Sequence, residues 1–329
     1  MSRASRTLAA PLQLAGRTAV DDGQRELLYF GGCDYYRFSR DRRLLAVLRR
    51  ATVRYGLSVC ASRTTTGNHP LYGELEVRLA DFFGAPRALV LPSGYGANLA
   101  VAEALRGQVQ TALIDAKAHY SLWSAADALG CDVVPFHHRD PEDLLRALRW
   151  KSAPGRVILL TDGMFSLTGH VAPLRDYLAV LPRQGVVLVD DAHAAGVLGA
   201  HGQGTLEAQE VDRVRVIQTI TLSKALGCYG GAVLGSSWLC DQVAAKSAVR
   251  GQHSIPLPLA AMARAALDRL KTDPSVENAA AEMSPPFAAP YRRLVSQSGS
   301  LKPNHCASPA RPADRGRCNG PVGGEHPLR

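Results

Sequence analysis

Seven short runs of aliphatic and β-branched residues, separated by longer helical patterns, constrain the fold of this 329-residue chain most strongly. The runs occupy residues 87–92, 111–115, 132–136, 156–162, 186–191, 216–223 and 230–235, and helical periodicity occupies 97–105, 121–129, 141–150 and 173–181. Continuous apolar runs such as VVLV are typical of strands buried on both faces. The pattern predicts an α/β fold with a mostly parallel sheet covered by helices, in which ligands bind at the carboxyl ends of the strands.

Charge and cysteine content limit the classes of protein to which the chain can belong. The net charge is +9, but residues 1–20 hold three arginines and no acid, and residues 284–329 hold seven Lys and Arg against two acids. The middle of the chain is then nearly neutral, which argues against nucleic-acid binding. No apolar run is long enough to span a membrane. Seven cysteines without a C-x-x-C pair indicate a reducing, cytoplasmic location.

The histidines do not predict a metal site. His137 and His138 are adjacent, so their side chains diverge in a strand. His201 lies too far from His193 in the sequence to form a helical pair of metal ligands. We therefore expect no bound metal.

Three segments of the chain differ in composition. Residues 1–27 hold no acid before Asp21 and are interpreted as an N-terminal leader without regular structure, with a targeting peptide as the alternative. Residues 28–283 hold the strand and helix patterns. Residues 284–329 hold eight of the twenty prolines and no regular period, so they are predicted to be a disordered tail. The alternative is a shifted reading frame that replaced a C-terminal domain.

The sequence VVLVDDAHAAGVLG, residues 186–199, places an acid directly after a buried strand. The carboxylate of Asp190 would point from the edge of the sheet into a pocket of low dielectric, where it needs a cationic partner. His193 can face the same pocket three residues later. A strand-end acid solvated in a loop is the alternative for Asp190 taken alone.

The sequence TLSKALGCYGG, residues 221–231, sets Lys224 between two predicted strands. Partial burial would lower the pKa of its amine, and the neutral amine could attack a carbonyl group to form a Schiff base. Thr221 and Ser223 offer hydroxyl groups to a phosphate. A solvated lysine on a glycine-rich turn is the alternative.

A third motif, LPSGYGAN at residues 91–98, joins a strand to a helix. Backbone N–H groups at Ser93, Gly94 and Tyr95 and the positive end of the helix favour a phosphate dianion. The motif lacks the G-K-[ST] of a Walker loop and the glycine spacing of a Rossmann fold. Taken alone, it is also compatible with a tight turn that binds nothing.

A phosphate site, a strand-end carboxylate and a lysine amine are together what pyridoxal 5'-phosphate (PLP) requires. In this combination the chain resembles the α-oxoamine synthase family of PLP enzymes over roughly residues 28–270. Seven segments carry the resemblance, in order YFGGCDYY, TTTGNHPLYGELEVRLADFFG, LPSGYGAN, DAKAHYSLWSA, TDGMFSLTGH, VDDAHAAGVLGAHGQG and TLSKALGCYGG. The resemblance implies PLP fold type I, the fold of aspartate aminotransferase, with PLP as the cofactor.

The resemblance also implies roles for individual residues. Lys224 matches the lysine that forms a Schiff base with PLP and moves the proton at the α-carbon of the amino acid. Asp190 matches the acid beside the pyridine nitrogen, and His119 matches the histidine that stacks on the ring, although such a histidine could otherwise belong to the core. The remaining matches are His193 and Ser166 near the phenolic oxygen, Ser93, Gly94, Tyr95 and Thr221 at the phosphate, and Ser254 in a segment that reaches the neighbouring subunit. Lys224, His119, Asp190 and His193 are the predicted catalytic residues.

The chain departs from the family pattern in three places. Cys33 stands where asparagine is common, and Tyr72 stands where histidine is typical, so the identity of the substrate stays open. After Met283 nothing resembles the small C-terminal domain that closes over the site in the family. We expect that domain to be largely missing.

The implied activity is that of a PLP-dependent acyltransferase of the 8-amino-7-oxononanoate synthase type. Such an enzyme condenses a small amino acid with an acyl thioester, carried by CoA or an acyl-carrier protein, and releases CO2 to give an α-amino ketone. A homodimer is implied as well. Two alternatives stay open, a PLP-binding remnant with impaired catalysis and a PLP-dependent aminotransferase. A DNA-binding regulator is disfavoured because no helix-turn-helix segment precedes the domain.

Overall fold

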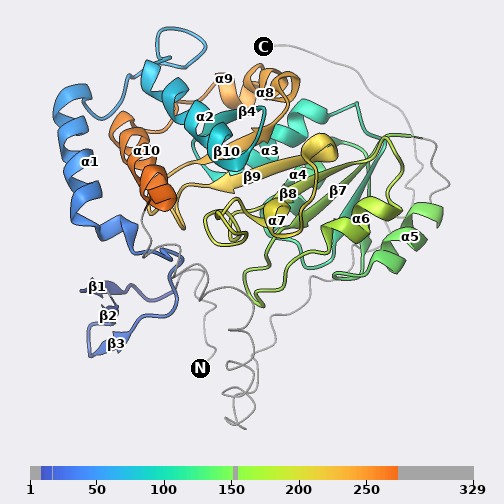
Figure 1. The fold of residues 1–329 in the computed structure, drawn as a ribbon, viewed down its shortest axis with the longest axis horizontal. Coiled ribbons are helices and arrows are strands. Elements are labelled where there is room, and N and C mark those ends of the chain that lie inside the picture. Colours follow the sequence, from blue (N-terminus) through green and yellow to red (C-terminus); the bar gives the residue numbers. More distant parts are fainter. Residues whose placement is uncertain (1–8, 17, 151–154, 273–329) are drawn as a thin grey trace, which may run out of the picture. The chain divides into compact units, whose positions relative to one another are not determined.

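A seven-stranded sheet lies at the centre of the computed structural model, which describes residues 9–16, 18–150 and 155–272 (Figure 1). Its strand order is β4-β10-β9-β8-β7-β5-β6. The strands are β4 (Arg87–Leu91), β5 (Thr111–Asp115), β6 (Asp132–Phe136), β7 (Val157–Asp162), β8 (Val186–Asp190), β9 (Val216–Thr221) and β10 (Gly231–Gly235). All seven predicted strands are confirmed, because runs of this length and apolarity have no alternative that buries them as well.

The sheet is mostly parallel, as predicted. β6, β5, β7, β8 and β9 pair in parallel in that spatial order, whereas β10 is antiparallel to both β9 and β4. β10 follows β9 after only the short connection 222–230, and parallel neighbours need a longer crossover. This connection, which carries Lys224, therefore turns back on itself at the carboxyl end of β9.

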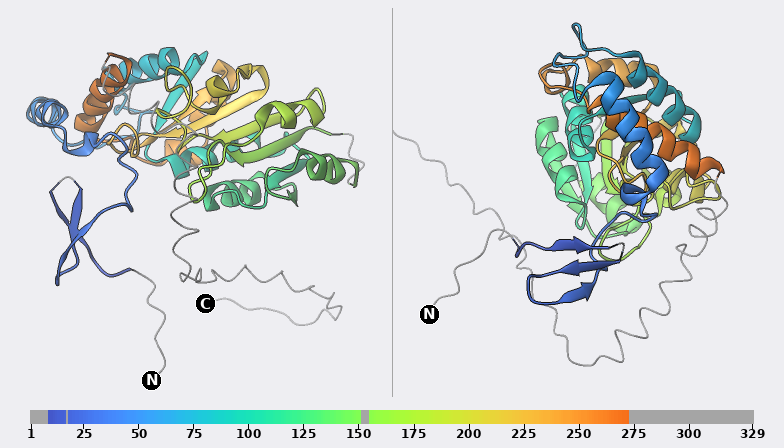
Figure 2. Two further views of the ribbon diagram at one scale, coloured as in Figure 1. Left: turned by 60° about the horizontal axis from the view of Figure 1, so that its bottom comes forward. Right: turned by 90° about the vertical axis from the view of Figure 1, so that its left-hand side faces the viewer.

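Helices cover both faces of the sheet, as Figures 1 and 2 show. One face is covered by α3 (Gly94–Leu105), α4 (Tyr120–Leu129) and α8 (Ser237–Ala244). The other face is covered by α2 (Pro70–Phe83), α5 (Pro141–Trp150), α6 (Leu174–Val180), α7 (Thr205–Ala208) and α10 (Leu257–Thr272). The remaining helices are α1 (Arg42–Tyr55), which packs on α10, α9 (Ser247–Arg250) and the short 3-10 turns η1 (Phe38–Arg40) and η2 (Arg213–Arg215).

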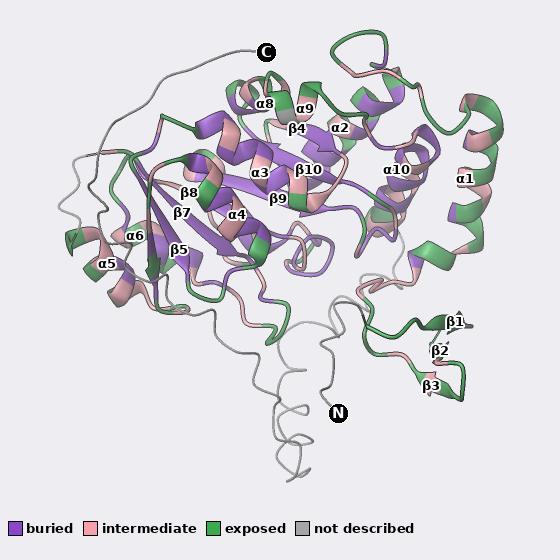
Figure 3. Ribbon diagram, turned by 180° about the vertical axis from the view of Figure 1, so that it is seen from behind, coloured by how far each residue is buried: buried purple, intermediate pink, exposed green. Residues whose placement is uncertain are grey.

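Successive strand residues point to opposite helical layers. Ala112 and Ile114 of β5 pack with α3 and α4, whereas Leu113 packs with Leu174 and Tyr177 of α6. Figure 3 shows the strands almost entirely in the colour of buried residues. The same alternation continues to the last residue of each strand, so it decides which layer each strand-end side chain faces.

The four predicted helices are confirmed as α3, α4, α5 and α6, with ends that differ by at most three residues. Helices α1, α2, α8 and α10 were not predicted, although ordinary end signals delimit them. The carboxylate of Asp41 caps α1 by accepting from the N–H groups of Arg43 and Leu44. Pro70 begins α2, and Gly84 ends it in the left-handed region.

The N-terminal segment contains more regular structure than the sequence predicted. Three short strands, β1 (Gln13–Ala15), β2 (Ala19–Asp21) and β3 (Glu26–Leu28), form an antiparallel sheet in the expected leader 1–27, one residue beyond which β3 ends. Strands of three residues carry too short a pattern for periodicity to identify. The expected tail 284–329 lies outside the described residues. Among the described helices, none combines the length and the apolar character needed to cross a membrane.

We predict that Leu75→Ala lowers the free energy of unfolding by about 2 to 5 kcal/mol, because Leu75 is fully buried in the cluster that joins α2 to α10 and β4. Urea unfolding followed by circular dichroism measures the change. The matched control is Val77→Ala on the same helix, where the side chain is 60% exposed and the expected change is within about 0.5 kcal/mol. Equal effects of the two substitutions would contradict the packing described here.

Candidate active site

Three neighbouring strands end beside one another and bring the predicted site residues to one edge of the sheet. Asp162 at the end of β7 pairs in register with Asp190 at the end of β8, and Asp190 pairs with Thr219 of β9. Lys224 follows β9 by three residues. The two carboxylates and the amine come from segments far apart in the sequence, and the parallel register places them together.

Asp190 is held by a hydrogen-bond network below the sheet edge. Its side chain is 7% exposed, and Oδ2 accepts from Asn98 Nδ2 at 2.6 Å and from Ser121 Oγ at 3.3 Å. Asn98 is itself fully buried on α3 and accepts from Thr219 Oγ1 at 2.6 Å. The network fixes one oxygen of the carboxylate on α3 and α4, while Oδ1 accepts from the N–H of Ala192 at 3.0 Å.

Lys224 is partly buried in a site with acidic neighbours. Burial lowers the pKa of the Lys224 amine, and the charges of Asp190, Cys33 and Asp162 oppose that change. Since the shift is still downward, the loss of hydration outweighs the attraction of the neighbouring charges. A larger fraction of the amine is therefore neutral, and nucleophilic, than for a solvated lysine.

His193 is half-buried and contacts Tyr35. The Tyr35 hydroxyl and His193 Nδ1 are 2.7 Å apart and share a hydrogen bond. Burial, followed by the charges of Lys224 and His119, lowers the pKa of His193 to about 4. Burial also raises the pKa of the Tyr35 hydroxyl. Both groups are therefore neutral at pH 7 and act as hydrogen-bonding groups rather than as charges.

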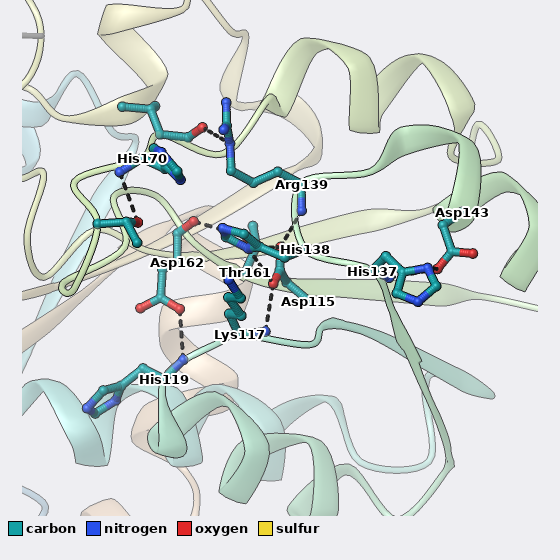
Figure 4. A network of polar contacts seen from close by, with 12 residues as sticks. Asp115, Lys117, His119, His137, His138, Arg139, Asp143, Thr161, Asp162 and His170 are labelled. Carbon is teal, nitrogen blue, oxygen red and sulfur yellow. Dashed lines mark hydrogen bonds and ion pairs between the residues drawn. The ribbon is translucent and has the colours of Figure 1, made fainter. Parts of the chain in front are cut away.

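His119 caps α4 and is fixed by two neighbours, as Figure 4 shows in part. Its backbone N–H donates to Asp162 Oδ2 at 2.8 Å, and its Nδ1 accepts from the N–H of Ser121 at 3.2 Å. His119 Nδ1 also lies 2.7 Å from Ser121 Oγ and shares a hydrogen bond with it. Burial, and then the charge of Asp190, raise the pKa of Asp162 to about 8. Asp162 was not predicted as a site residue.

The turn before α3 forms a cradle with the end of β9. A methyl group built on Gly94 would lie 3.0 Å from Thr221 Cβ, and one built on Gly231 would lie 2.5 Å from the Gly94 backbone nitrogen. Only glycine permits this approach. The close approach brings the first turn of α3 next to the Thr221 hydroxyl, and the first N–H groups of a helix have no partner inside it. Ser223 Oγ lies 2.7 Å from Thr221 Oγ1. Ser93 caps the same helix by accepting from the N–H of Gly96 at 2.9 Å.

Three predicted residues are placed less directly. The Tyr95 hydroxyl lies 2.7 Å from Ser124 Oγ on α4, so only the backbone of Tyr95 belongs to the cradle. Ser166 lies in an exposed turn after β7, and within the described residues no hydrogen bond joins it to His193. Ser254 lines a cavity of about 200 Å³ beside β4, together with Arg63 and Arg87.

Sequence reasoning missed four residues of this site, namely Asn98, Ser121, Asp162 and Tyr35. Asp162 gave the same signal as Asp190, an acid directly after a buried strand, and could have been found from it. The others gave no usable signal, because their partners are supplied by other elements. Among the described residues, no group of His, Cys, Asp or Glu side chains could hold a metal ion. His138 instead contacts the buried Asp115 at 2.9 Å (Figure 4).

We predict that Asn98→Ala lowers the free energy of unfolding by about 1.5 to 3 kcal/mol, because the buried Asp190 carboxylate and Thr219 hydroxyl lose a shared partner. Chemical denaturation at pH 7 measures the change. Asn68→Ala is the control, since exposed Asn68 only accepts from Arg63 and should change stability by less than about 1 kcal/mol. If Asn98→Ala is as mild as Asn68→Ala, the network does not hold Asp190.

We predict that the free energy of unfolding falls less between pH 7 and pH 5 in His193→Gln than in the wild type. The unfolded chain protonates this histidine near its ordinary pKa of about 6.5, whereas the folded chain does so only near 4. The stability that His193 contributes is therefore present above about pH 6.5 and is lost as the pH falls toward 4. Comparison of unfolding free energies at pH 7 and pH 5 measures this, with exposed His253→Gln as the control. Equal pH dependence in all three proteins would refute it.

Comparison with known proteins places this site in a family. The model of aminotransferase class I and II matches residues 28–296. A putative 8-amino-7-oxononanoate synthase from Caulobacter vibrioides is 38% identical over 264 residues, which are 79% of this chain and 68% of the relative. An 8-amino-7-oxononanoate synthase from Maricaulis maris is 35% identical over 296 residues, 88% of this chain and 73% of the relative.

Solved structures give the same result. The serine palmitoyltransferase from S. paucimobilis with a bound adduct of PLP and myriocin matches with a TM-score of 0.73 and 28% identity over 79% of this chain. The chain spans 66% of the length of that structure. The serine palmitoyltransferase of Sphingomonas wittichii matches with a TM-score of 0.72 and 26% identity, over 78% of this chain and 65% of that structure.

The donor set of the site fits PLP. A partly desolvated amine, a buried carboxylate and the N-terminus of α3 lie on one edge of the sheet, and they are complementary to an aldehyde, a protonated pyridine nitrogen and a phosphate. The sheet and its two helical layers are those of PLP fold type I, as predicted. The chain belongs to the aminotransferase class I and II family and, within it, to the PLP-dependent α-oxoamine synthases.

Proposed function

We propose that this chain catalyses the decarboxylative condensation of a small amino acid with an acyl thioester. The α-carbon of the amino acid bonds to the acyl carbon, the thiol leaves, and the amino-acid carboxylate departs as CO2, so the product is an α-amino ketone. One observation carries the proposal, namely the partly desolvated Lys224 amine beside the buried Asp190 carboxylate. The names of the relatives from Caulobacter and Maricaulis support the same activity.

We assign the cofactor-binding roles as follows. When bound, PLP withdraws electrons from the α-carbon of the amino acid and so stabilises negative charge there. Lys224 would hold its aldehyde, and Asp190 its ring nitrogen. Asp190 suits this role because Asn98 and Ser121 stabilise its charged form. The phosphate would be held by Ser93, Thr221 and the first N–H groups of α3 at Gly94 and Tyr95.

The catalytic roles follow from the protonation states of the side chains. Lys224 would remove and return the proton at the α-carbon, a task for which a lowered pKa is suited. His119 would lie on the face of the cofactor ring, since its backbone is fixed by Asp162. His193, neutral and bonded to Tyr35, would donate to the phenolic oxygen without adding charge. We propose Ser166 as a second contact of that oxygen.

We propose further that residues 28–283 form the PLP-binding large domain and that two copies assemble into a cytoplasmic homodimer. The proposal for the domain is supported by the family match over residues 28–296. The segment around Ser254, with its own cavity beside β4, is where we expect the second copy to approach. The acyl thioester would come from CoA or from a carrier protein.

A direct test supplies glycine, alanine or serine, labelled at the carboxyl carbon, together with acyl-CoA substrates of increasing chain length. Release of labelled CO2 that depends on both substrates, with appearance of a free thiol, would support the proposal. Exchange of the amino group with a keto acid, without CO2 release, would identify an aminotransferase instead. Binding of PLP without either reaction would identify a catalytically impaired remnant.

We predict that Lys224→Ala lowers kcat by at least about 10²- to 10⁴-fold, because the base at the α-carbon is lost. Borohydride reduction of the wild-type protein with PLP should leave a pyridoxyl group on the peptide that contains Lys224, and mass spectrometry of the variant should find none. Lys271→Ala, which removes an exposed lysine at the end of α10, is the control and should match the wild type. Reductive labelling at another lysine in the wild type would reject the assignment.

A further inference from the structure

Helix α1 presents an unusually basic outer face. Between residues 37 and 54 the chain holds seven arginines and one acid, Asp41, whose carboxylate pairs with Arg269. Five of these arginines lie on α1 itself, which contains no acid, and all five are exposed, namely Arg42, Arg43, Arg49, Arg50 and Arg54. In residues 9–16, 18–150 and 155–272 none of the five forms an ion pair. Figure 3 shows the outer side of α1 largely in the colour of exposed residues.

The positions of these side chains follow from the helical period. Leu44 and Ala51 are buried on the side of α1 that packs on α10. The five arginines lie on the other sides of the helix. Arg42 and Arg49 lie seven residues apart on one stripe, and Val53 lies beside them with 86% of its surface exposed. Leu45, four residues before Arg49, is 39% exposed. The outer face is thus a set of cations with apolar side chains between them.

This face begins close to the active site. Tyr35, which bonds to His193, precedes α1 by only seven residues. A methyl group built on Gly227, three residues after Lys224, would lie 2.4 Å from the backbone nitrogen of Ser39. The connection that carries Lys224 therefore packs directly against the segment that leads into α1. A partner bound on α1 would be near the side of the site that Tyr35 forms.

Three possible occupants do not suit the charge and shape of this face. Residues 284–329 hold seven Lys and Arg against two acids, so they repel it. A second copy that placed α1 against itself about a two-fold axis would also bring like charges together. A membrane would require an apolar face for insertion, but the apolar face of α1 is already packed on α10.

An acidic protein suits the face better than a nucleic acid does. Protein interfaces combine arginine with apolar side chains, as Leu45 and Val53 provide here, whereas contacts to a phosphate backbone are polar. We propose that the outer face of α1 is a docking surface for an acidic protein. The identity of that protein rests on the function proposed above, and it is a carrier protein that brings the acyl group to Lys224 as a thioester on a flexible arm.

The test uses the full chain loaded with PLP and a purified acidic acyl-carrier protein in its acylated form. The variant is Arg42→Glu combined with Arg49→Glu. We expect its Kd for the carrier protein, measured by calorimetry at low salt, to rise about tenfold or more, because two attractive charges become repulsive. The KM for the acylated carrier should rise in parallel, with kcat and the KM for the corresponding acyl-CoA unchanged.

Two matched variants make the test specific. Arg149→Glu with Arg183→Glu changes the net charge equally at exposed positions on α5 and before β8, and it should bind like the wild type. Arg42→Lys with Arg49→Lys keeps the charge and should also bind. Thermal unfolding of each variant checks that it is folded. An unchanged Kd in the charge reversal, or an equal loss in the distant reversal, would overturn the proposal.

The outcomes also separate this proposal from the proposed function. If binding depends on Arg42 and Arg49 but no CO2 is released from any substrate, the docking surface stands and the proposed function falls. If acyl-CoA is turned over but the carrier protein does not bind, the docking surface falls alone. A parallel rise in the KM for acyl-CoA would show that the face binds the phosphates of CoA. Tighter, arginine-dependent binding of duplex DNA or of vesicles of anionic phospholipid would likewise reject an acidic protein as the partner.

Discussion

The site depends on one buried carboxylate, that of Asp190, and on the groups that compensate its burial. Asp190 is 7% exposed, and a carboxylate removed from water at such a position costs several kcal/mol unless it is compensated. The amide of Asn98 and the hydroxyl of Ser121 supply part of the compensation as hydrogen bonds, each of about 1.5 to 3 kcal/mol. The rest must come from positive charge. In the protein Lys224 is the neighbouring base, and in the function we propose the ring nitrogen of PLP would supply positive charge as well.

Asp162 is the same kind of residue at the equivalent place on the neighbouring strand, yet its chemistry differs. Its pKa is raised to about 8 by burial and then by Asp190, and its carboxylate has a single described partner, the N–H of His119. Two carboxylates that lie this close cannot both be stabilised by one lysine, so the one with fewer hydrogen bonds holds the proton. Asp190 has more hydrogen-bond donors than Asp162 because α3 and α4 supply Asn98 and Ser121 to it.

A third acid, Asp191, shows that the alternation of side chains along a strand decides which helical layer a residue contacts. Asp191 directly follows Asp190 and therefore points to the opposite helical layer. It is fully buried and accepts from Thr205 Oγ1 at 2.6 Å and from Gln218 Nε2 at 2.6 Å. These bonds tie the end of β8 to α7 and β9, and so they fix both ends of the loop that carries His193. One acid of the pair thus faces α3 and α4, while the other holds the loop in place.

The sequence predicted the strands well and the site only in part, for a physical reason. A strand buried on both faces is identified by its own residues, and so is an acid that directly follows it, such as Asp190. Asn98 lies 92 residues from Asp190 in the sequence, and nothing in the helix around it indicates which face meets the sheet. Strands β1 to β3 escaped notice because three residues carry too little pattern. The antiparallel direction of β10 follows from the shortness of the connection 222–230, and the residues of β10 themselves do not indicate it.

The net charge of a stretch of sequence likewise does not show which charges lie near one another in space. Summed over the middle of the sequence, acids and bases nearly cancel, and that sum argues against any electrostatic binding surface. In solution, however, a charge acts over about 8 to 10 Å, so only its near neighbours in space can cancel it. On α10 and α2 the bases Arg264, Arg269 and Arg78 lie against Glu74, Asp41 and Asp268, whereas α1 has no such acids on its outer side. Local pairing, which only the fold reveals, decides which arginines are available to a partner.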